Sequence, residues 1–227
     1  MQNKTPDVSI IIVSWNVADL LAACLDSILN SDIQIGSVGD GKYVAEIIVI
    51  DSASQDDTIA MLKAHYPQVT LLAQNENVGF TRGNNIGFEA AQGRYLFMLN
   101  PDTELLDNAL PQMLDYLEAH PDVGIIGPHT LNSDGSTQST RRRFPTVKLG
   151  FFESTWLQGI APKKMLSQFY VEDIEDDAIA EVDWVQGSAL LARREVYEQI
   201  GGLDTNYVMF FEELDWCKRA KNAGWRV

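Results

Sequence analysis

The chain alternates short apolar runs with segments of helical periodicity, and this alternation restricts its fold more than any other feature. The apolar runs are continuous and rich in β-branched residues, as in VSIIIVSW at 8–15, which is typical of strands covered on both faces of a sheet. Between the runs, apolar residues recur at helical spacing, as in ADLLAACLDSILN at 18–30. This order predicts an α/β fold with a Rossmann-like, doubly wound, mostly parallel sheet and helices on both faces.

The alternation is strongest in the first 128 residues. There we predict strands at 8–15, 45–52, 69–73, 94–99 and 123–127, and helices at 18–30, 54–65, 82–93 and 107–120. Beyond them we predict one strand at 182–192, interrupted at Gly187, and helices at 194–200 and 214–223. No linker rich in Pro, Gly or Ser separates the two parts, so we predict one domain over 1–227 with an elaborated second half at 129–227.

Composition and charge disfavour several classes of protein. Hydrophobic residues make up 45% of the chain and charged residues 22%, a balance typical of globular proteins. The formal net charge of −15 opposes binding to a phosphate backbone, so we expect no nucleic-acid partner. Any anionic substrate would need a metal ion or a local cluster of basic residues to neutralise its charge.

The cysteines and the apolar runs favour a reducing, aqueous compartment. Cys24 and Cys217 are too few for a disulfide framework or a zinc site. No apolar run approaches the roughly 20 residues that span a bilayer, and the start, MQNKTPDVS, shows no signal-peptide pattern. We expect a cytoplasmic protein, with peripheral attachment to the inner face of the cell membrane left open.

A carboxylate follows the second predicted strand, at the end where open parallel sheets bind ligands. Asp51 closes the run IIVID, and the small polar residues SASQD come next. The Asp51 carboxylate can accept hydrogen bonds from a nucleotide base or ribose. The alternative is that it caps the helix that follows.

A second acidic position follows the strand predicted at 94–99. Pro101 has no N–H to donate to a sheet, so the strand ends there and Asn100 and Asp102 emerge at its carboxyl edge. In a doubly wound sheet, Asp51 and Asp102 would face one crevice, where Asp102 and a diphosphate could share a divalent cation. The alternative is that Asp102 only caps the next turn.

A third acidic cluster lies in FFEELDW at 210–216, which contains Glu212, Glu213 and Asp215. Desolvation by the aromatic neighbours and mutual repulsion would raise the pKa of at least one carboxyl, as a general base requires. The alternative is that these acids begin a helix and complement its dipole.

The segment NENVGFTRGNNIG at 75–87 has glycines for close backbone approach and asparagines for hydrogen bonding. It lacks the Lys-Ser/Thr pair of a phosphate-cradling loop, and no G-x-G-x-x-G follows the first strand. The chain also has no Gly-x-Ser-x-Gly elbow and no His/Cys ligand set. The missing motifs therefore disfavour P-loop nucleoside triphosphatases, dinucleotide-binding dehydrogenases and serine hydrolases of the Gly-x-Ser-x-Gly type.

Together these motifs resemble those of glycosyltransferase family 2, and more closely its bacterial rhamnosyltransferase-like branch, which builds cell-surface polysaccharides. In chain order they are VSIIIVSWN, IIVIDSASQD, NVGFTRGNNIGFEAAQGRYLFMLNPDTE, GSALLARREVYEQIGGLD and FFEELDWCKRAKNAGWRV. The resemblance is weakest at 129–181. It implies a GT-A fold and inverting transfer of a sugar from a nucleoside-diphosphate sugar to a hydroxyl of a saccharide or lipid-linked saccharide acceptor.

The resemblance also implies roles for individual residues. Asp102 would bind a divalent metal ion, Mn²⁺ or Mg²⁺. Glu213 would be the general base, with Asp215 as the second candidate and Glu212 beside them. The implied nucleotide-sugar contacts are Trp15, Asn16, Asp51, Asn77, Gly79, Phe80, Asn85 and Asn100.

The chain departs from the family pattern in three places. The first acid of the metal motif is Asn100, which would weaken metal binding. The base position, usually Asp, is Glu213, whose side chain is one methylene longer. The chain ends at GWRV, where family members usually continue with a strand and a His that can complete the metal site. We therefore expect a C-terminally truncated domain, with a nucleotide-sugar-binding half at 1–128 and an acceptor-side half at 129–227.

Two other functions compete with sugar transfer. A sugar-nucleotide nucleotidyltransferase should carry a Gly-rich basic loop after the first strand, where this chain has SWNVADL. A non-catalytic nucleotide-sugar-binding domain would not need acids at all three strand ends. The run Arg141–Arg143 is open to two interpretations: a solvated loop, which we favour, or a site for the diphosphate of a lipid-linked acceptor.

Overall fold

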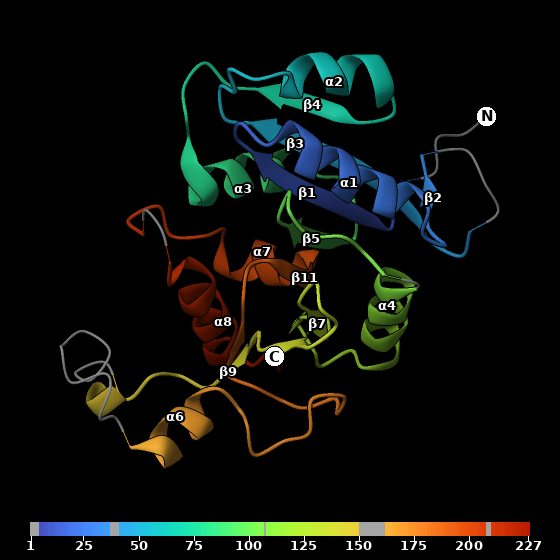
Figure 1. Cartoon of the computed structure of the whole chain (residues 1–227). Coiled ribbons are helices and arrows are strands. Elements are labelled where there is room, and N and C mark those ends of the chain that lie inside the picture. Colours follow the sequence, from blue (N-terminus) through green and yellow to red (C-terminus); the bar gives the residue numbers. More distant parts are fainter. Residues whose placement is uncertain (1–4, 37–40, 107, 150–161, 208–209) are drawn as a thin grey trace.

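A seven-stranded sheet forms the centre of the computed structural model, which describes residues 5–36, 41–106, 108–149, 162–207 and 210–227 (Figure 1). The strand order is β2-β3-β1-β5-β11-β6, with β4 also paired to β3. These strands are β1 (Val8–Ser14), β2 (Gln34–Ile35), β3 (Val44–Asp51), β4 (Thr70–Ala73), β5 (Tyr95–Leu99), β6 (Ile125–Ile126) and β11 (Ala189–Arg193). Within this sheet β11 runs antiparallel to β5 and β6 and the other pairs are parallel, which confirms the predicted fold class.

Helices cover both faces of the sheet because successive strand residues point to opposite sides. They are α1 (Ala18–Leu29), α2 (Thr58–His65), α3 (Gly79–Ala90), α4 (Ala109–Ala119), α7 (Arg194–Ile200) and α8 (Glu212–Asn222). Ile10 and Ile12 of β1 lie in the apolar core formed with α1, α2 and α4. Ile11 lies in the opposite core, with α3, α7 and α8. α3 packs tightly there, since a methyl group added at Gly87 would lie 2.3 Å from Ile11 Cγ2.

The structure differs from the predicted elements mainly in the second half of the chain. The strand predicted at 182–192 is two strands, β10 (Trp184–Val185) and β11, because the chain leaves the central sheet before Ala189. β10 pairs instead with β9 (Arg141–Arg142). The helix predicted from residue 54 begins at Thr58. Further short elements that the sequence did not predict are β7 (Thr130–Leu131), β8 (Thr137–Gln138) and α6 (Lys163–Phe169).

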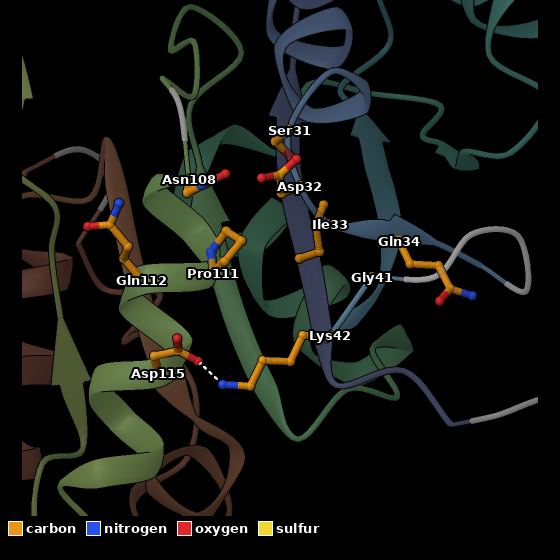
Figure 2. Close-up of a pocket in the computed structure, with 10 residues that line it drawn as sticks. All are labelled: Ser31, Asp32, Ile33, Gln34, Gly41, Lys42, Asn108, Pro111, Gln112 and Asp115. Carbon is orange, nitrogen blue, oxygen red and sulfur yellow. Dashed lines mark hydrogen bonds and ion pairs between the residues drawn. The ribbon is translucent and has the colours of Figure 1, made fainter.

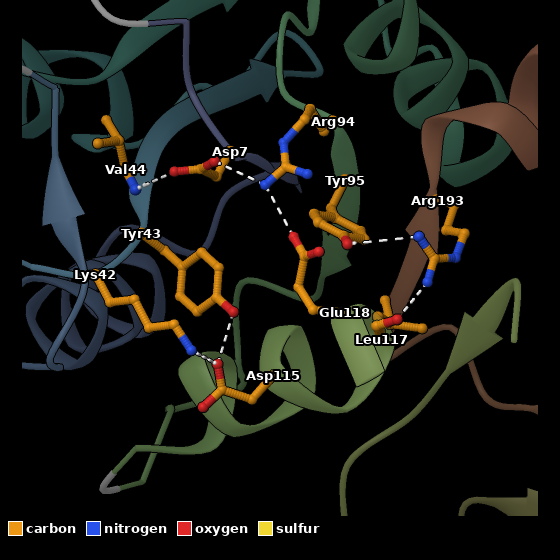
Figure 3. Close-up of polar contacts among 10 residues, drawn as sticks. All are labelled: Asp7, Lys42, Tyr43, Val44, Arg94, Tyr95, Asp115, Leu117, Glu118 and Arg193. Carbon is orange, nitrogen blue, oxygen red and sulfur yellow. Dashed lines mark hydrogen bonds and ion pairs between the residues drawn. The ribbon is translucent and has the colours of Figure 1, made fainter. Parts of the chain in front are cut away.

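Polar contacts fill the amino-terminal edge of the central sheet (Figure 3). Arg94, just before β5, donates hydrogen bonds of 2.9 Å to the carboxylates of Asp7 and Glu118. Tyr43, just before β3, donates a hydrogen bond of 2.6 Å to Asp115 of α4. These bonds tie α4 to the starts of the strands, so this edge of the sheet is occupied by contacts that hold the fold together.

The arginine run is engaged within the chain. The Arg141 guanidinium donates to the carbonyl oxygens of Ile174, Glu175 and Ala178. The Arg143 guanidinium forms a two-pronged ion pair with the Asp173 carboxylate, at 2.8 and 2.9 Å. The run therefore holds the acidic segment 171–181 against β9, a role that neither sequence interpretation included.

We predict that Arg141→Met will lower the free energy of unfolding by about 1–3 kcal/mol, because three carbonyl oxygens lose a charged donor while the apolar stem is kept. Thermal unfolding should show a lower melting temperature, and limited proteolysis should cut 171–181 faster. Lys148→Met, at an exposed position seven residues on, is the matched control. Equal melting temperatures for the two variants would show that Arg141 does not hold this segment.

Candidate active site

The carboxyl ends of three neighbouring strands bring the predicted site residues to one edge of the sheet. Ser14 at the end of β1 is the in-register partner of Asp51 at the end of β3. β5 lies on the other side of β1 and ends at Leu99, so Asn100 follows at the same edge. Because adjacent strands are roughly 4.8 Å apart, the backbones at Asp51 and Asn100 are separated by roughly 10 Å, about the span of a nucleoside diphosphate.

The third acidic cluster reaches this edge through the start of β11. The backbone N–H of Asn100 donates a hydrogen bond of 2.9 Å to the carbonyl of Ser188. A methyl group added at the preceding residue, Gly187, would lie 3.2 Å from Phe80 Cζ and 3.9 Å from Glu213 Cβ. The three acidic clusters, which are far apart in the sequence, therefore converge on one edge of the fold.

Asp51 is fully buried and only partly satisfied. Its Oδ2 accepts a hydrogen bond of 2.9 Å from the Ser54 backbone N–H. Its Oδ1, together with the hydroxyl oxygens of Ser14 and Ser52, is buried without a hydrogen-bond partner. An unsatisfied buried polar group costs about 1–3 kcal/mol, and such groups often mark a place completed by water or a ligand. Asp51 is not the cap of α2, which begins only at Thr58.

The loops after β1 and β3 are tied together. The Asn16 side-chain oxygen accepts a hydrogen bond of 2.7 Å from Gln55, and the Asn16 backbone N–H donates one of 2.9 Å to the Ser54 hydroxyl. Asn16 and Ala53 have φ angles of 54° and 59°, in the left-handed region that non-glycine residues rarely adopt. Trp15, with 54% of its surface exposed, stands beside this joined pair of loops. Its indole is free to lie against a planar base.

The asparagine side chains in and just before α3 form hydrogen bonds within the chain. Asn77, two residues before α3, accepts a hydrogen bond of 2.9 Å from the Gly79 backbone N–H, and α3 starts at Gly79 rather than at residue 82. The Asn85 amide both donates to and accepts from the backbone of Leu203, at 2.8 Å in each case. Asn85 thus anchors the segment after α7, a positioning role that its motif in the sequence did not reveal. Phe80 lies at Gly187, beside Glu213.

Asp102 is exposed, and within the described part of the chain its carboxylate forms no hydrogen bond or ion pair. Asn100 beside it is half-buried. Burial raises the pKa of the Cys24 thiol to about 12, and the negative charges of Asp102 and Glu104 add to this rise. The potential at this corner therefore favours a cation. No group of three or more metal-ligating His, Cys, Asp or Glu side chains occurs among the described residues, so phosphate and water oxygens would have to complete the coordination of any ion.

The acids of the first turn of α8 have different environments. Burial raises the pKa of Glu212 and of Glu213, and the neighbouring Glu212 charge and the Gly187 backbone N–H make smaller, opposite contributions at Glu213. One carboxylate oxygen of each glutamate is buried without a hydrogen-bond partner among the residues that the structure describes. Asp215 instead accepts a hydrogen bond of 2.6 Å from Arg219, an i,i+4 ion pair that the sequence spacing could have indicated. Glu213 and Glu212 are therefore better placed to act as a base than Asp215.

The cavity shown in Figure 2 lies away from this edge. Its volume is about 640 Å³, and it is lined by the loop before β2, by residues just before β3 and by one side of α4, including Asp32, Lys42 and Asp115 respectively. None of the predicted site residues lines it. A second cavity, of about 440 Å³, is lined by Arg143, Asp173 and their neighbours. Neither of these two cavities contains a predicted site residue; the candidate active site is instead marked by the orphaned polar atoms at the carboxyl edge of the sheet.

The fold is that of the GT-A glycosyltransferases, and comparison with known proteins gives the family. The model of glycosyl transferase family 2 matches residues 9–180, and the chain belongs to this family. The N-acetylglucosaminyl-diphospho-decaprenol L-rhamnosyltransferase of Mycobacterium tuberculosis is 27% identical over 79% of this chain and 62% of its own length. Rhamnosyltransferase WbbL of Escherichia coli is 27% identical over 97% of this chain and 79% of its own length.

Solved structures show the same fold. The mannosyltransferase PcManGT from Pyrobaculum calidifontis, determined in complex with GDP-Man and Mn²⁺, superposes with a TM-score of 0.63 at 19% identity, covering 98% of this chain and 54% of its own. The chain thus spans about three fifths of the length of the mycobacterial relative and about half of this structure. Within the described residues, no helix combines the length and apolar character needed to cross a membrane.

Proposed function

We propose that this chain carries the donor site and the general base of an inverting glycosyltransferase, which moves a sugar from a nucleoside-diphosphate sugar to an acceptor hydroxyl. The observation that supports this most is the convergence of Asp51, Asp102 and Glu213 on one sheet edge, each with an unpaired carboxylate oxygen. The relatives support it further, since two of them are named as rhamnosyltransferases and a third, from Haloferax volcanii, as a glycan biosynthesis hexosyltransferase.

The residues divide the chemistry between them. Asp51 Oδ1 accepts a hydrogen bond from the nucleotide, with Trp15 against the base, so the diphosphate extends toward Asn100 and Asp102. Glu213 accepts the proton of the acceptor hydroxyl as that oxygen bonds to the anomeric carbon. The bond from this carbon to the diphosphate oxygen breaks on the opposite face, so the configuration inverts. No covalent intermediate is needed.

A divalent metal ion is consistent with the donor set, because Asp102 is exposed and unpaired at a corner of negative potential. Asp102 would hold it, with Asn100 as a weaker neutral ligand and the donor phosphates completing the coordination. When bound, the ion would stabilise the charge that develops on the leaving diphosphate.

The names of the relatives also suggest the class of the transferred sugar and of the acceptor. We propose that the transferred sugar is a hexose or deoxyhexose and that the acceptor is a saccharide on a lipid diphosphate, made at the cytoplasmic face of a membrane for a surface polysaccharide. Residues 1–128 would bind the donor and 129–227 would face the acceptor, within one domain. The position of Glu213 in α8, after the strand ends that precede Asp102 and carry Asp51, supports this division.

A binding and turnover screen tests the proposal. The chain is mixed with diphosphates of the common nucleosides and with their sugar conjugates, with and without Mn²⁺, and thermal shift and nucleotide release are recorded. A ligand at 100 times its dissociation constant should add about 2.7 kcal/mol to the free energy of unfolding. The sugar conjugate of the nucleotide that binds should be turned over, with release of the free nucleoside diphosphate. Pyrophosphate released from a nucleoside triphosphate and a sugar phosphate would instead indicate a nucleotidyltransferase. Binding without any turnover would indicate a non-catalytic domain.

A further inference from the structure

Two successive phenylalanines have a backbone conformation that their side chains disfavour. Phe210 and Phe211 have φ angles of 69° and 70°, in the left-handed region. For a non-glycine residue this conformation is disfavoured because Cβ crowds the following carbonyl oxygen. The rings are also exposed, at 68% and 53%, and neither belongs to the two apolar cores. The contacts of the described chain give no folding reason for two aromatic rings at this place.

The pair lies next to the proposed general base. Phe211 is the N-cap residue of α8, and Glu212 and Glu213 follow in the first turn. The segment that leads to the pair is fixed on α3, because the Thr81 hydroxyl donates a hydrogen bond of 3.0 Å to the carbonyl of Tyr207. In Figure 1 the coloured part of the chain that follows α7 lies near the start of α3, where Thr81 is. Tyr207 and the first turn of α8 are therefore fixed points on either side of the pair.

The location distinguishes the acceptor from the donor. The donor nucleotide is assigned to the ends of β1, β3 and β5, and the base must touch the acceptor hydroxyl. Phe210 and Phe211 directly precede the first turn of α8, which carries Glu213, and they lie outside the strand ends assigned to the donor. We therefore assign them to the acceptor side. A sugar ring has C–H faces that pack against aromatic faces, while its hydroxyls remain free for polar partners. An anionic membrane surface is a poorer occupant because the net charge of the chain is −15.

We propose that Phe210 and Phe211 form an aromatic platform that binds the ring of the acceptor saccharide and turns its reactive hydroxyl toward Glu213. The proposal rests on the proposed sugar-transfer function. It also gives a reason for the strained backbone, since strain at a site often fixes a binding geometry that the fold itself does not need.

The platform can be tested by binding, without any turnover. The probes are octyl glycosides of glucose, galactose, mannose, N-acetylglucosamine and rhamnose, observed by saturation-transfer NMR. At least one probe should receive saturation at its ring protons in the wild-type chain, and the double variant Phe210→Ala/Phe211→Ala should lose about tenfold or more of that affinity. Phe211→Tyr should retain it. Ile179→Ala, at an apolar position with 79% exposure outside the site, is the matched control and should bind like wild type.

A second pair of variants separates binding from stability. Phe211→Ala and Phe211→Asn both remove the ring, but Asn tolerates the left-handed region better. The Asn variant should melt roughly 1–3 °C above the Ala variant, and both should lose the probe equally. Probe affinity that follows the melting temperature would show that the rings only support the fold, and would overturn the proposal.

The outcomes also separate this proposal from the proposed function. Unchanged probe affinity in the double variant, saturation confined to the octyl chain, or sedimentation with anionic vesicles that depends on the two rings would overturn the platform while leaving sugar transfer intact. Where the donor screen shows turnover, the double variant should keep the rate of donor hydrolysis by water and the KM for the donor. Its KM for the octyl glycoside should rise about tenfold.

Discussion

Replacing Glu213 by Gln is expected to lower sugar transfer by about a hundredfold or more while leaving donor binding near the wild-type value. Gln keeps the shape and burial of the side chain but cannot accept the proton of the acceptor hydroxyl. Nucleotide release in the presence of acceptor, and calorimetric titration with the donor nucleotide, measure the two effects separately. Near-normal turnover would remove Glu213 from the role of base.

The same variant should have a pH signature. Burial raises the pKa of Glu213, so between the unfolded and the folded pKa the folded chain binds the Glu213 proton more tightly than the unfolded chain does. The stabilising contribution of the protonated form is present below the unfolded pKa and is lost as the pH rises through the folded pKa. Glu213→Gln should therefore raise the melting temperature at pH 8, and the gain should vanish in acid. Transfer by the wild type should fall as the pH is lowered, because a protonated Glu213 cannot accept a proton. The midpoint of this fall should lie at a higher pH than the pKa of an exposed glutamate.

Two matched variants on α8 and α7 complete this experiment. Glu212→Gln removes the neighbouring buried carboxylate, whose pKa burial also raises, and should reduce transfer much less than Glu213→Gln. Glu195→Gln removes an exposed glutamate from the start of α7 and should change neither activity nor stability. A larger loss in Glu212→Gln than in Glu213→Gln would assign the base to Glu212.

Replacing Asp102 by Ala is expected to abolish the effect of metal on donor affinity. In the wild-type chain Mn²⁺ should tighten nucleoside-diphosphate binding by about tenfold or more. This is a minimum, because loss of a residue that only supports a metal ligand already lowers metal affinity about tenfold. The variant should bind the diphosphate equally with and without Mn²⁺, and its melting temperature should not change, because Asp102 is exposed and unpaired.

The neighbouring acid provides the control for Asp102. Glu104→Ala removes another exposed carboxylate two residues on and should preserve the effect of Mn²⁺. Asn100→Asp adds a charged ligand beside Asp102 and should tighten Mn²⁺ binding. The same response to Mn²⁺ in Asp102→Ala and wild type would take Asp102 out of the metal site.

Much of the fold was predictable because its signals are local. The continuous apolar runs at β1, β3 and β5 indicate strands buried on both faces, and Pro101 marks the end of β5. The strand predicted at 182–192 was the main error, since an apolar run does not show where a strand changes sheet. Within 129–181, β7 and β8 are two-residue strands that pair with each other, too short for a period to reveal. The segment 171–181 is held by Arg141 and Arg143, whose partners lie about 30 residues away, so no local pattern shows it.

The sequence by itself determined the order of strands and helices and which carboxylates follow strand ends, because apolar period and chain-breaking residues act over a few neighbours. Only the tertiary structure decided which of these groups meet and which are left unpaired. Gly187 lies close to both Phe80 of α3 and Glu213 of α8, and the Asn85 amide is bonded to Leu203, 118 residues away. Such contacts depend on how helices and loops from distant parts of the chain pack together on the sheet, so no local pattern specifies them.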